Sequence, residues 1–319
     1  VIAYAVETAT GPALFALRGR AVEDMMTGEE RFTVEGPFAL PLPPADEAPA
    51  YLAVAGSGQH IYAAWRDGRM TRLRTAPLTD AFVAETGRLV PDDAKLTAVA
   101  FALGGTTLMW GDSKGRVFGG FPVRMNAFDG TGLPDGERRP RATFQMALAK
   151  RLGKETSPVR FLVPCARSRL IFVGHEDGTL AVYNTTSEAR LVRTSLPGGK
   201  AVGRLAVAPR EDGILALDTG GMHFFHFDPM YTEADFNSLF RPIWYEGYPE
   251  PMHMWQSSSA SDDFEPKMGL IPLIFGTLKA TFYAMLFGAP IALLAAIFSS
   301  EFLHPRIKAV VKPAVEMMA

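Results

Sequence analysis

The feature that most constrains this chain is an apolar run near its C-terminal end. Residues 280–300 are 21 consecutive positions without a formally charged side chain. A helix of that length crosses the hydrocarbon core of a bilayer, which is about 30 Å thick. The residues just before it are also apolar, and Lys279 lies where its stem can reach the headgroups. We predict a transmembrane helix over residues 269–303; the alternative is a buried helix, although such helices rarely run this long without a charged face.

The charges on either side of this helix predict its orientation. Three basic residues follow it, Arg306, Lys308 and Lys312, whereas carboxylates and a single lysine, Lys267, precede it. Positive flanks stay in the cytoplasm. We therefore expect residues 304–319 to form a cytoplasmic turn that leads to a further span. The residues before the helix then lie outside the cytoplasm, in the periplasm of a cell with two membranes.

The helix also carries a row of small residues. They recur at every fourth position: Gly276, Ala280, Ala284, Gly288, Ala292, Ala296 and Ser300. Small side chains let the backbones of neighbouring membrane helices approach closely, so the row predicts that this helix packs in a bundle. Pro290 removes one backbone donor and is expected to bend the helix.

The soluble part contains a repeated hairpin pattern that is anchored on four glycines: Gly68, Gly115, Gly178 and Gly221. Seven positions before each glycine stands an aliphatic residue that begins a short apolar strand: Ile61, Leu108, Ile171 and Ile214. Turn-forming residues separate that strand from the glycine, and a second strand follows it. A further strand precedes each hairpin, over residues 51–55, 96–101, 159–163 and 205–208.

The spacing of the repeats predicts a mainly β fold of the β-propeller (WD40-like) type. The four glycines are separated by 47, 63 and 43 residues, and two of these intervals suit one four-stranded blade. A polar Gly/Pro insertion, residues 126–140, explains the long interval and is expected to be an exposed loop. Residues 13–17 and 31–34 predict a partial fifth blade. We assign residues 1–235 to an incomplete propeller, the other blades being expected upstream; a β-sandwich or barrel is the alternative.

A segment rich in aromatic residues and proline, residues 236–268, joins this domain to the helix. It contains the aromatic residues Phe240, Trp244, Tyr245, Tyr248 and Trp255, together with Pro242, Pro249 and Pro251. Such side chains suit docking on the propeller and also the headgroup level of a membrane, and the sequence leaves both open.

The polar groups that could act in catalysis or bind a metal are better interpreted as solvent-facing, turn or linker residues. His223 and His226 are three apart on an expected strand, hence on opposite faces, and are interpreted as edge or solvent-facing residues. The polar residues 175–177 occupy a hairpin turn. Asp262, Asp263 and Glu265 lack the spacing of a calcium loop and are interpreted as part of a solvated linker.

Composition excludes other classes of function. The net charge is −2, with no basic tract for nucleic acid. Cys165 is the only cysteine and lies in an apolar run, as expected of a small buried side chain. Phosphate-binding loops and serine-nucleophile elbows are absent from the sequence. We therefore assign no catalytic, cofactor-binding or metal-binding residue and predict that the chain is not an enzyme. Its first residue, Val1, follows no leader pattern, which suggests an internal fragment.

The last 75 or so residues resemble a known family of membrane proteins. The likeness rests on Tyr245-Glu-Gly-Tyr248, Trp255-Gln-Ser-Ser-Ser259, residues 262–267, residues 273–281, residues 290–297, Ser300-Glu301 and residues 312–319. In these motifs the chain is similar to the permease subunit of phosphate ABC importers, the PstC type. Some larger members look similar in carrying an extra soluble domain before this helix.

This resemblance implies a multi-pass subunit of the bacterial inner membrane. Its implied partners are membrane lipid, a second permease subunit, a separate ATP-binding subunit and a periplasmic phosphate-binding protein. The propeller would then serve protein interaction or regulation. Two alternatives remain open: a membrane-tethered propeller that acts as a sensor or scaffold without transport, and a propeller enzyme of the lactonase or quinoprotein kind.

Overall fold

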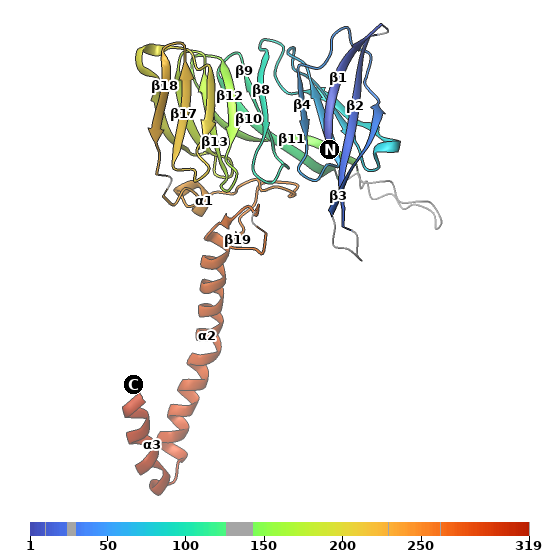
Figure 1. Cartoon of the computed structure of the whole chain (residues 1–319). Coiled ribbons are helices and arrows are strands. Elements are labelled where there is room, and N and C mark those ends of the chain that lie inside the picture. The colour runs from blue at the N-terminus through green and yellow to red at the C-terminus, as the bar shows by residue number, and fades with distance from the viewer. Residues whose placement is uncertain (10, 24–29, 126–142, 229, 262, 319) are drawn as a thin grey trace, which may run out of the picture.

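The computed structural model describes residues 1–9, 11–23, 30–125, 143–228, 230–261 and 263–318, and shows a mainly β protein with one long helix. Strands make up 45% of the chain and helices 19%. Small antiparallel sheets stand side by side in the N-terminal part, and the helix α2 (Ile271–Ile297) extends away from one end of them (Figure 1). The predicted insertion, residues 126–140, lies outside the described residues.

Five of the sheets, which we number I to V in chain order, form the body of the domain. Each is a meander in which consecutive strands pair antiparallel. Sheet I holds β1 (Ile2–Thr8), β2 (Gly11–Glu23) and β3 (Glu30–Leu40). Sheet II holds β4 (Tyr51–Val54), β5 (His60–Ala64), β6 (Arg69–Arg74) and β7 (Phe82–Arg88), with the 3₁₀ turn η1 (Leu78–Asp80) before β7. Sheet III holds β8 (Leu96–Phe101), β9 (Leu108–Asp112), β10 (Arg116–Met125) and β11 (Thr143–Lys154).

The last two sheets follow the same plan. Sheet IV holds β12 (Val159–Pro164), β13 (Leu170–His175), β14 (Thr179–Asn184) and β15 (Arg190–Ser195). After the 3₁₀ turn η2 (Pro197–Gly199), sheet V holds β16 (Arg204–Val207), β17 (Gly213–Asp218) and β18 (Gly221–His226). Strands thus appear at all four predicted hairpins, and the expected partial fifth unit is the three-stranded sheet I.

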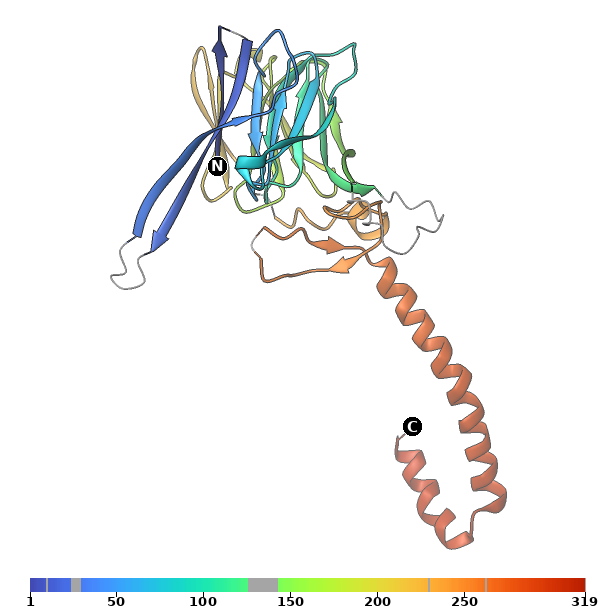
Figure 2. The same cartoon turned by 90° about the vertical axis from the view of Figure 1, so that its right-hand side faces the viewer.

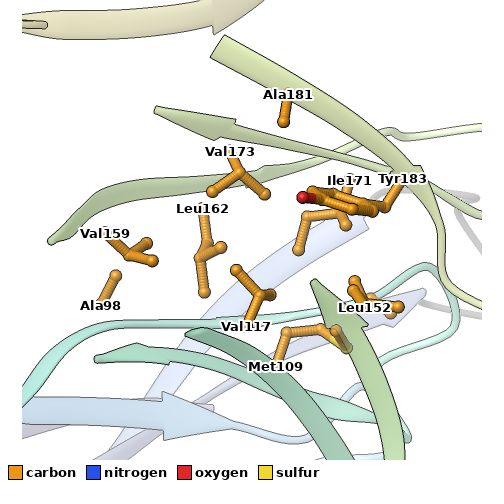
Figure 3. Close-up of a cluster of buried hydrophobic side chains, with 11 residues drawn as sticks. Ala98, Met109, Val117, Leu152, Val159, Leu162, Ile171, Val173, Ala181 and Tyr183 are labelled. Atoms are coloured by element: carbon orange, nitrogen blue, oxygen red, sulfur yellow. The ribbon is translucent and has the colours of Figure 1, made fainter. Parts of the chain in front are cut away.

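The hydrophobic core lies between the sheets, where each one packs face to face on the next. The first strands of successive sheets, β1, β4, β8, β12 and β16, are neighbours in that order. Between sheets III and IV, the fully buried side chains of Met109, Val117, Ile171 and Val173 meet in one cluster (Figure 3). Burying one such side chain stabilises the fold by about 1.5–3 kcal/mol. A row of sheets packed in this way is propeller-like and unlike a two-sheet sandwich, although the described residues form no closed ring.

The hairpin glycines have the backbone conformation that the repeat requires. The φ angles of Gly68, Gly115, Gly178 and Gly221 are 92°, 74°, 84° and 148°, a region that L side chains rarely adopt. An aspartate side chain closes each turn by accepting backbone N–H groups: Asp67, Asp112, Asp177 and Asp218. The seven-residue spacing therefore encodes a strand, an aspartate-closed turn and a left-handed glycine.

A long helix is present where the membrane span was predicted, and its side chains are exposed in the described structure. Residues Ile271–Phe302 form the one helix of the described residues that is long and apolar enough to cross a membrane. It comprises α2 and a π-helical turn, η3 (Phe298–Phe302), and the amphipathic helix α3 (Pro305–Met318) follows. A Cβ built at Gly276 or Gly288 would meet no atom within 4 Å. Packing of the small-residue row in a bundle and a bend at Pro290 stay predictions.

The hairpin turns give a test of the repeat. We expect Gly115→Ala to destabilise the domain more than Gly198→Ala, although both glycines have φ near 75°. A Cβ at Gly115 would lie 2.3 Å from the carbonyl oxygen of Glu155, whereas one at Gly198 would meet nothing within 4 Å. The backbone cost of about 1–2 kcal/mol is common to both, and overpacking adds about 1–3 kcal/mol at Gly115 alone. Denaturant unfolding followed by tryptophan fluorescence measures the difference; equal losses in the two variants would contradict the packing around this turn.

Candidate functional site

The segment between the sheets and the membrane helix is folded and lies against one end of the sheets. It contains the short helix α1 (Phe236–Phe240) and a two-stranded ribbon of β19 (Trp255–Gln256) and β20 (Lys267–Met268). Asp235 and Ser238 form a capping box that begins α1. Figure 2 shows this segment between the sheets and α2. We call residues 236–268 the linker.

The linker docks on sheets III and IV. The indole of Trp244 packs edge to face on the buried ring of Phe121 in β10, with 6.2 Å between ring centroids. Just before the linker, the carbonyl oxygen of Thr232 accepts a hydrogen bond of 3.0 Å from the side-chain amide of Asn184, the last residue of β14. Of the two options that the sequence left open, the structure therefore shows docking on the propeller-like domain.

A buried ionic contact joins the linker to the turns at the end of the sheets. Arg169, in the turn before β13, is 4% exposed, and its Nη1 lies 3.0 Å from Oε1 of Glu246 in the linker. The hydroxyl of Thr107, just before β9, donates to the same carboxylate oxygen. Arg169 also donates to the backbone carbonyl of Asp263. One arginine thus contacts two parts of the linker that are well separated in the sequence.

Glu265 makes a second bridge beside the first. Its Oε1 accepts from the hydroxyl of Thr186 at 2.9 Å, and its Oε2 accepts from the backbone N–H of Glu246 at 2.8 Å. The carbonyl oxygen of Thr186 in turn accepts from Nζ of Lys150, which is 1% exposed and extends from β11. Glu265 itself is 6% exposed, so both of its oxygens are used by donors inside the protein.

A third cation, Lys267, lies among aromatic rings of the linker. Its Nζ is 4.5 Å from the ring centroid of Phe264, 5.6 Å from that of Tyr245 and 5.9 Å from that of Tyr248. It donates to the carbonyl oxygen of Glu265 at 3.3 Å. Desolvated cation–π contacts of this kind contribute about 2 kcal/mol. We refer to Lys150, Arg169, Glu246, Glu265 and Lys267 as the ion network.

Burial governs the electrostatics of the ion network. It raises the pKa of Glu246, and the Glu265 carboxylate adds to the rise, while Arg169 opposes it. Burial also lowers the pKa of Lys150 and of Lys267, and Glu265 opposes that effect at both. Each charge therefore has an oppositely charged neighbour that compensates for part of its desolvation.

The ion network ends directly beside the membrane helix. Lys267 is in β20, and the backbone N–H groups of Gly269 and Leu270 donate to the carbonyl oxygens of Met254 and Leu239, each at 2.8 Å. The first residue of α2 is Ile271. The helix therefore begins immediately after residues that are hydrogen-bonded to the linker, which itself docks on sheets III and IV.

The structure corrects our interpretation of the acidic residues in the linker. Glu265 is not solvated; it is buried because the linker folds back onto sheets III and IV, where the hydroxyl of Thr186 and the backbone N–H of Glu246 donate to it. The side chain of Asp263 is exposed, but its backbone carbonyl accepts from Arg169. Asp262 lies outside the described residues.

The other singled-out residues have local roles. Asp177 closes its turn by accepting from the N–H of Thr179 at 2.9 Å, which confirms ordinary turn chemistry there. In the edge strand β18, His223 lies with its Nε2 3.1 Å from a carboxylate oxygen of Asp218. Cys165 is 3% exposed, as predicted, and burial raises the pKa of its thiol to about 12. The described residues contain no group of three or more His, Cys, Asp or Glu side chains that could hold a metal ion.

Comparisons with known proteins find no family for this chain. A scan of protein families and a search of curated proteins both find no match. Solved structures similar to this chain include the Cps50 (Swd1) β-propeller domain of Myceliophteria thermophila, at 12% identity and a TM-score of 0.45, covering 68% of this chain and 64% of that one.

Two more solved structures have a similar level of likeness. The computationally designed Ika4 protein has 15% identity and a TM-score of 0.42, with 59% of this chain and 97% of that chain covered. A putative 6-phosphogluconolactonase of Bacteroides fragilis has 14% identity and a TM-score of 0.42, with 72% and 68% covered. Likeness at this level carries no argument about activity.

We expect Glu265→Gln to release the linker while the sheets stay folded. The substitution removes the charge that offsets the desolvation of Lys150 and of Lys267, and it weakens the hydrogen bonds that Glu265 accepts from Thr186 and from the backbone of Glu246. Trypsin cleavage after Lys267 should then become at least about tenfold faster, because cleavage of a transiently opened segment follows its opening equilibrium. Mass spectrometry of the products identifies the cut.

Asp263→Asn is the matched control, since it removes a negative charge from the same segment but leaves the backbone carbonyl that Arg169 uses. It should keep the parent cleavage rate. Equal rates for the parent, Glu265→Gln and Asp263→Asn proteins would refute a docked linker.

Proposed function

We propose that this chain is a transmembrane subunit of an ABC importer of the phosphate type, with its propeller-like domain held rigidly outside the cytoplasm. The observation that carries the proposal is that the same residues occur in two places: in the motifs that resemble a permease and in the contacts between the domain and the helix. The soluble motifs in which the chain resembles PstC-type permeases contain Glu246, Glu265 and Lys267, and these same residues join the domain to the membrane helix. A requirement for a fixed position of the domain relative to the helix would explain why these residues belong to the motifs.

The membrane part supports the same proposal. A single anchor needs only apolar surface, whereas this helix has a small residue at every fourth position from Gly276 to Ser300. Such a row suits close packing against other spans of a translocation pathway. The basic residues after the helix, Arg306, Lys308 and Lys312, favour a cytoplasmic position for its end, and the sheets would then lie in the periplasm.

The propeller-like domain would act as a fixed surface for proteins that deliver or regulate the cargo. In an importer of this type the implied partners are a second permease subunit, an ATP-binding subunit and a periplasmic phosphate-binding protein. Hydrolysis of ATP would take place on the separate subunit. A rigid joint keeps a docked delivery protein in one position above the pathway.

A second candidate is a membrane-tethered scaffold or sensor with no part in transport. The observation in its favour is that the described residues contain one candidate span, which a tether also requires. The function of a tether, however, should not change when a small residue on one face of its helix is replaced by a large one. That difference separates the two candidates.

Phosphate uptake tests the proposal. In cells that lack other phosphate importers, we expect deletion of the gene for this chain to abolish ATP-dependent uptake of labelled phosphate. Gly288→Leu should lower uptake to below about a tenth, because a large side chain on the small-residue row separates the packed helices.

Ala289→Leu is the matched control: it adds a similar side chain about 100° away around the helix and should leave uptake near that of the parent. Unchanged uptake after deletion, or full uptake with Gly288→Leu at parental protein levels, would favour the scaffold.

A further inference from the structure

A cleft of about 530 Å³ lies between sheets II and III and does not involve the ion network. Small-molecule sites typically have volumes of about 300–1,000 Å³. Its lining combines cations with other polar and aromatic groups, among them Gln59, His60, Tyr62, Arg72, Arg74 and Phe144. In sheet II, His60 is paired with Arg74 and Tyr62 with Arg72, so these four side chains share one face of adjacent strands.

One wall of the cleft is held by a buried ion pair that joins the two sheets. Arg72 is 2% exposed; its Nε donates to Oε2 of Glu85 at 3.1 Å, and its Nη2 donates to the carbonyl oxygen of Phe144 in β11 at 2.6 Å. Glu85 in turn accepts from the backbone N–H of Met146 at 2.9 Å. These hydrogen bonds of Arg72 and Glu85 to residues of β11 hold sheets II and III at a fixed separation. The cleft is therefore present without a ligand.

The other side of the cleft is closed by two turns that touch. The backbone N–H of Gly56 donates to the carbonyl oxygen of Gly105 at 3.0 Å. Gly105 has a φ of 63°, and a Cβ there would lie 2.4 Å from the nitrogen of Gly56. The contact places Ser57 and Thr106, two further polar residues, on the lining.

The charges around the cleft are not balanced. Arg72 and Glu85 compensate each other, whereas Arg74 is exposed and forms no ion pair among the described residues. Nδ1 of His60 is buried and has no hydrogen-bond partner within the described part of the chain. Burial lowers the pKa of His60, and the charge of Arg72 lowers it further. The cleft thus presents one cation, Arg74, without an ion-pair partner in the described part of the chain, and the half-buried side chain of His60 is its cross-strand neighbour.

We propose that this cleft binds a small organic anion, a carboxylate or phosphate monoester carried on an apolar body. The anionic group would be received by Arg74 with His60 beside it, and the apolar body would lie against Tyr62 and Phe144. Guanidinium groups bind such anions through two parallel hydrogen bonds, and the aromatic rings supply contact area at low entropic cost. The proposal does not depend on the transport function.

Calorimetric titration of the whole chain in lipid nanodiscs tests this site. The probes are phenyl phosphate and benzoate, with inorganic phosphate as the anion without an apolar body and benzyl alcohol as the apolar body without charge. We expect both aromatic anions to bind, and each of the other two probes to bind at least about tenfold more weakly. Failure of both aromatic anions to bind, or equal affinity for inorganic phosphate or benzyl alcohol, would overturn the proposal.

Two protein variants locate the binding. Arg74→Gln should weaken phenyl phosphate at least about tenfold, while Arg204→Gln, at a second exposed arginine in a strand, should not change it. The imidazole signals of His60 in histidine-labelled protein, assigned by their loss in His60→Gln, should shift on titration. Unmoved His60 signals, or equal affinity in the parent and Arg74→Gln proteins, would contradict binding in this cleft.

Discussion

The arrangement of this protein depends on burying three cations and two carboxylates between the linker and the ends of sheets III and IV. Desolvation of each charge costs several kcal/mol, and the pairing of Arg169 with Glu246 and the contacts of Glu265 offset that cost only in one geometry. Apolar packing such as that of Trp244 on Phe121 adds stability but tolerates small shifts. We infer that the ions define where the membrane helix starts relative to the sheets.

The sheets hold in place the turns that contact the linker. Left-handed glycines and aspartate-closed turns fix each hairpin, and the buried faces between sheets fix the spacing of one hairpin from the next. As a result, Thr107, Arg169 and Thr186, which come from turns far apart in the sequence, lie within reach of one linker. The same rigidity keeps the cleft between sheets II and III open at its Arg72–Glu85 bridge.

Much of the fold, and little of the site, could be predicted from the sequence. The hairpins were predictable because each is a local pattern of a strand, a turn and a glycine, and the long apolar helix because residues 280–300 carry no formal charge; that this helix spans a membrane stays a prediction. Glu265 was misjudged because its partner Thr186, and Lys150, which donates to the carbonyl oxygen of Thr186, are remote in the sequence and no periodicity marks them. The likeness to PstC-type permeases that the sequence suggested also covered residues 245–248 and 262–267; that likeness stays a prediction.

The most direct test of the rigid joint is a distance measurement between the domain and the membrane helix. Spin labels at Glu176→Cys, on an exposed turn of sheet IV, and at Leu278→Cys in α2 report it in nanodiscs by double electron–electron resonance. Cys165 is buried and should stay unlabelled, which a single-cysteine control verifies. We predict one narrow distance distribution for the parent protein. A broad distribution, as a flexible tether gives, would contradict the account.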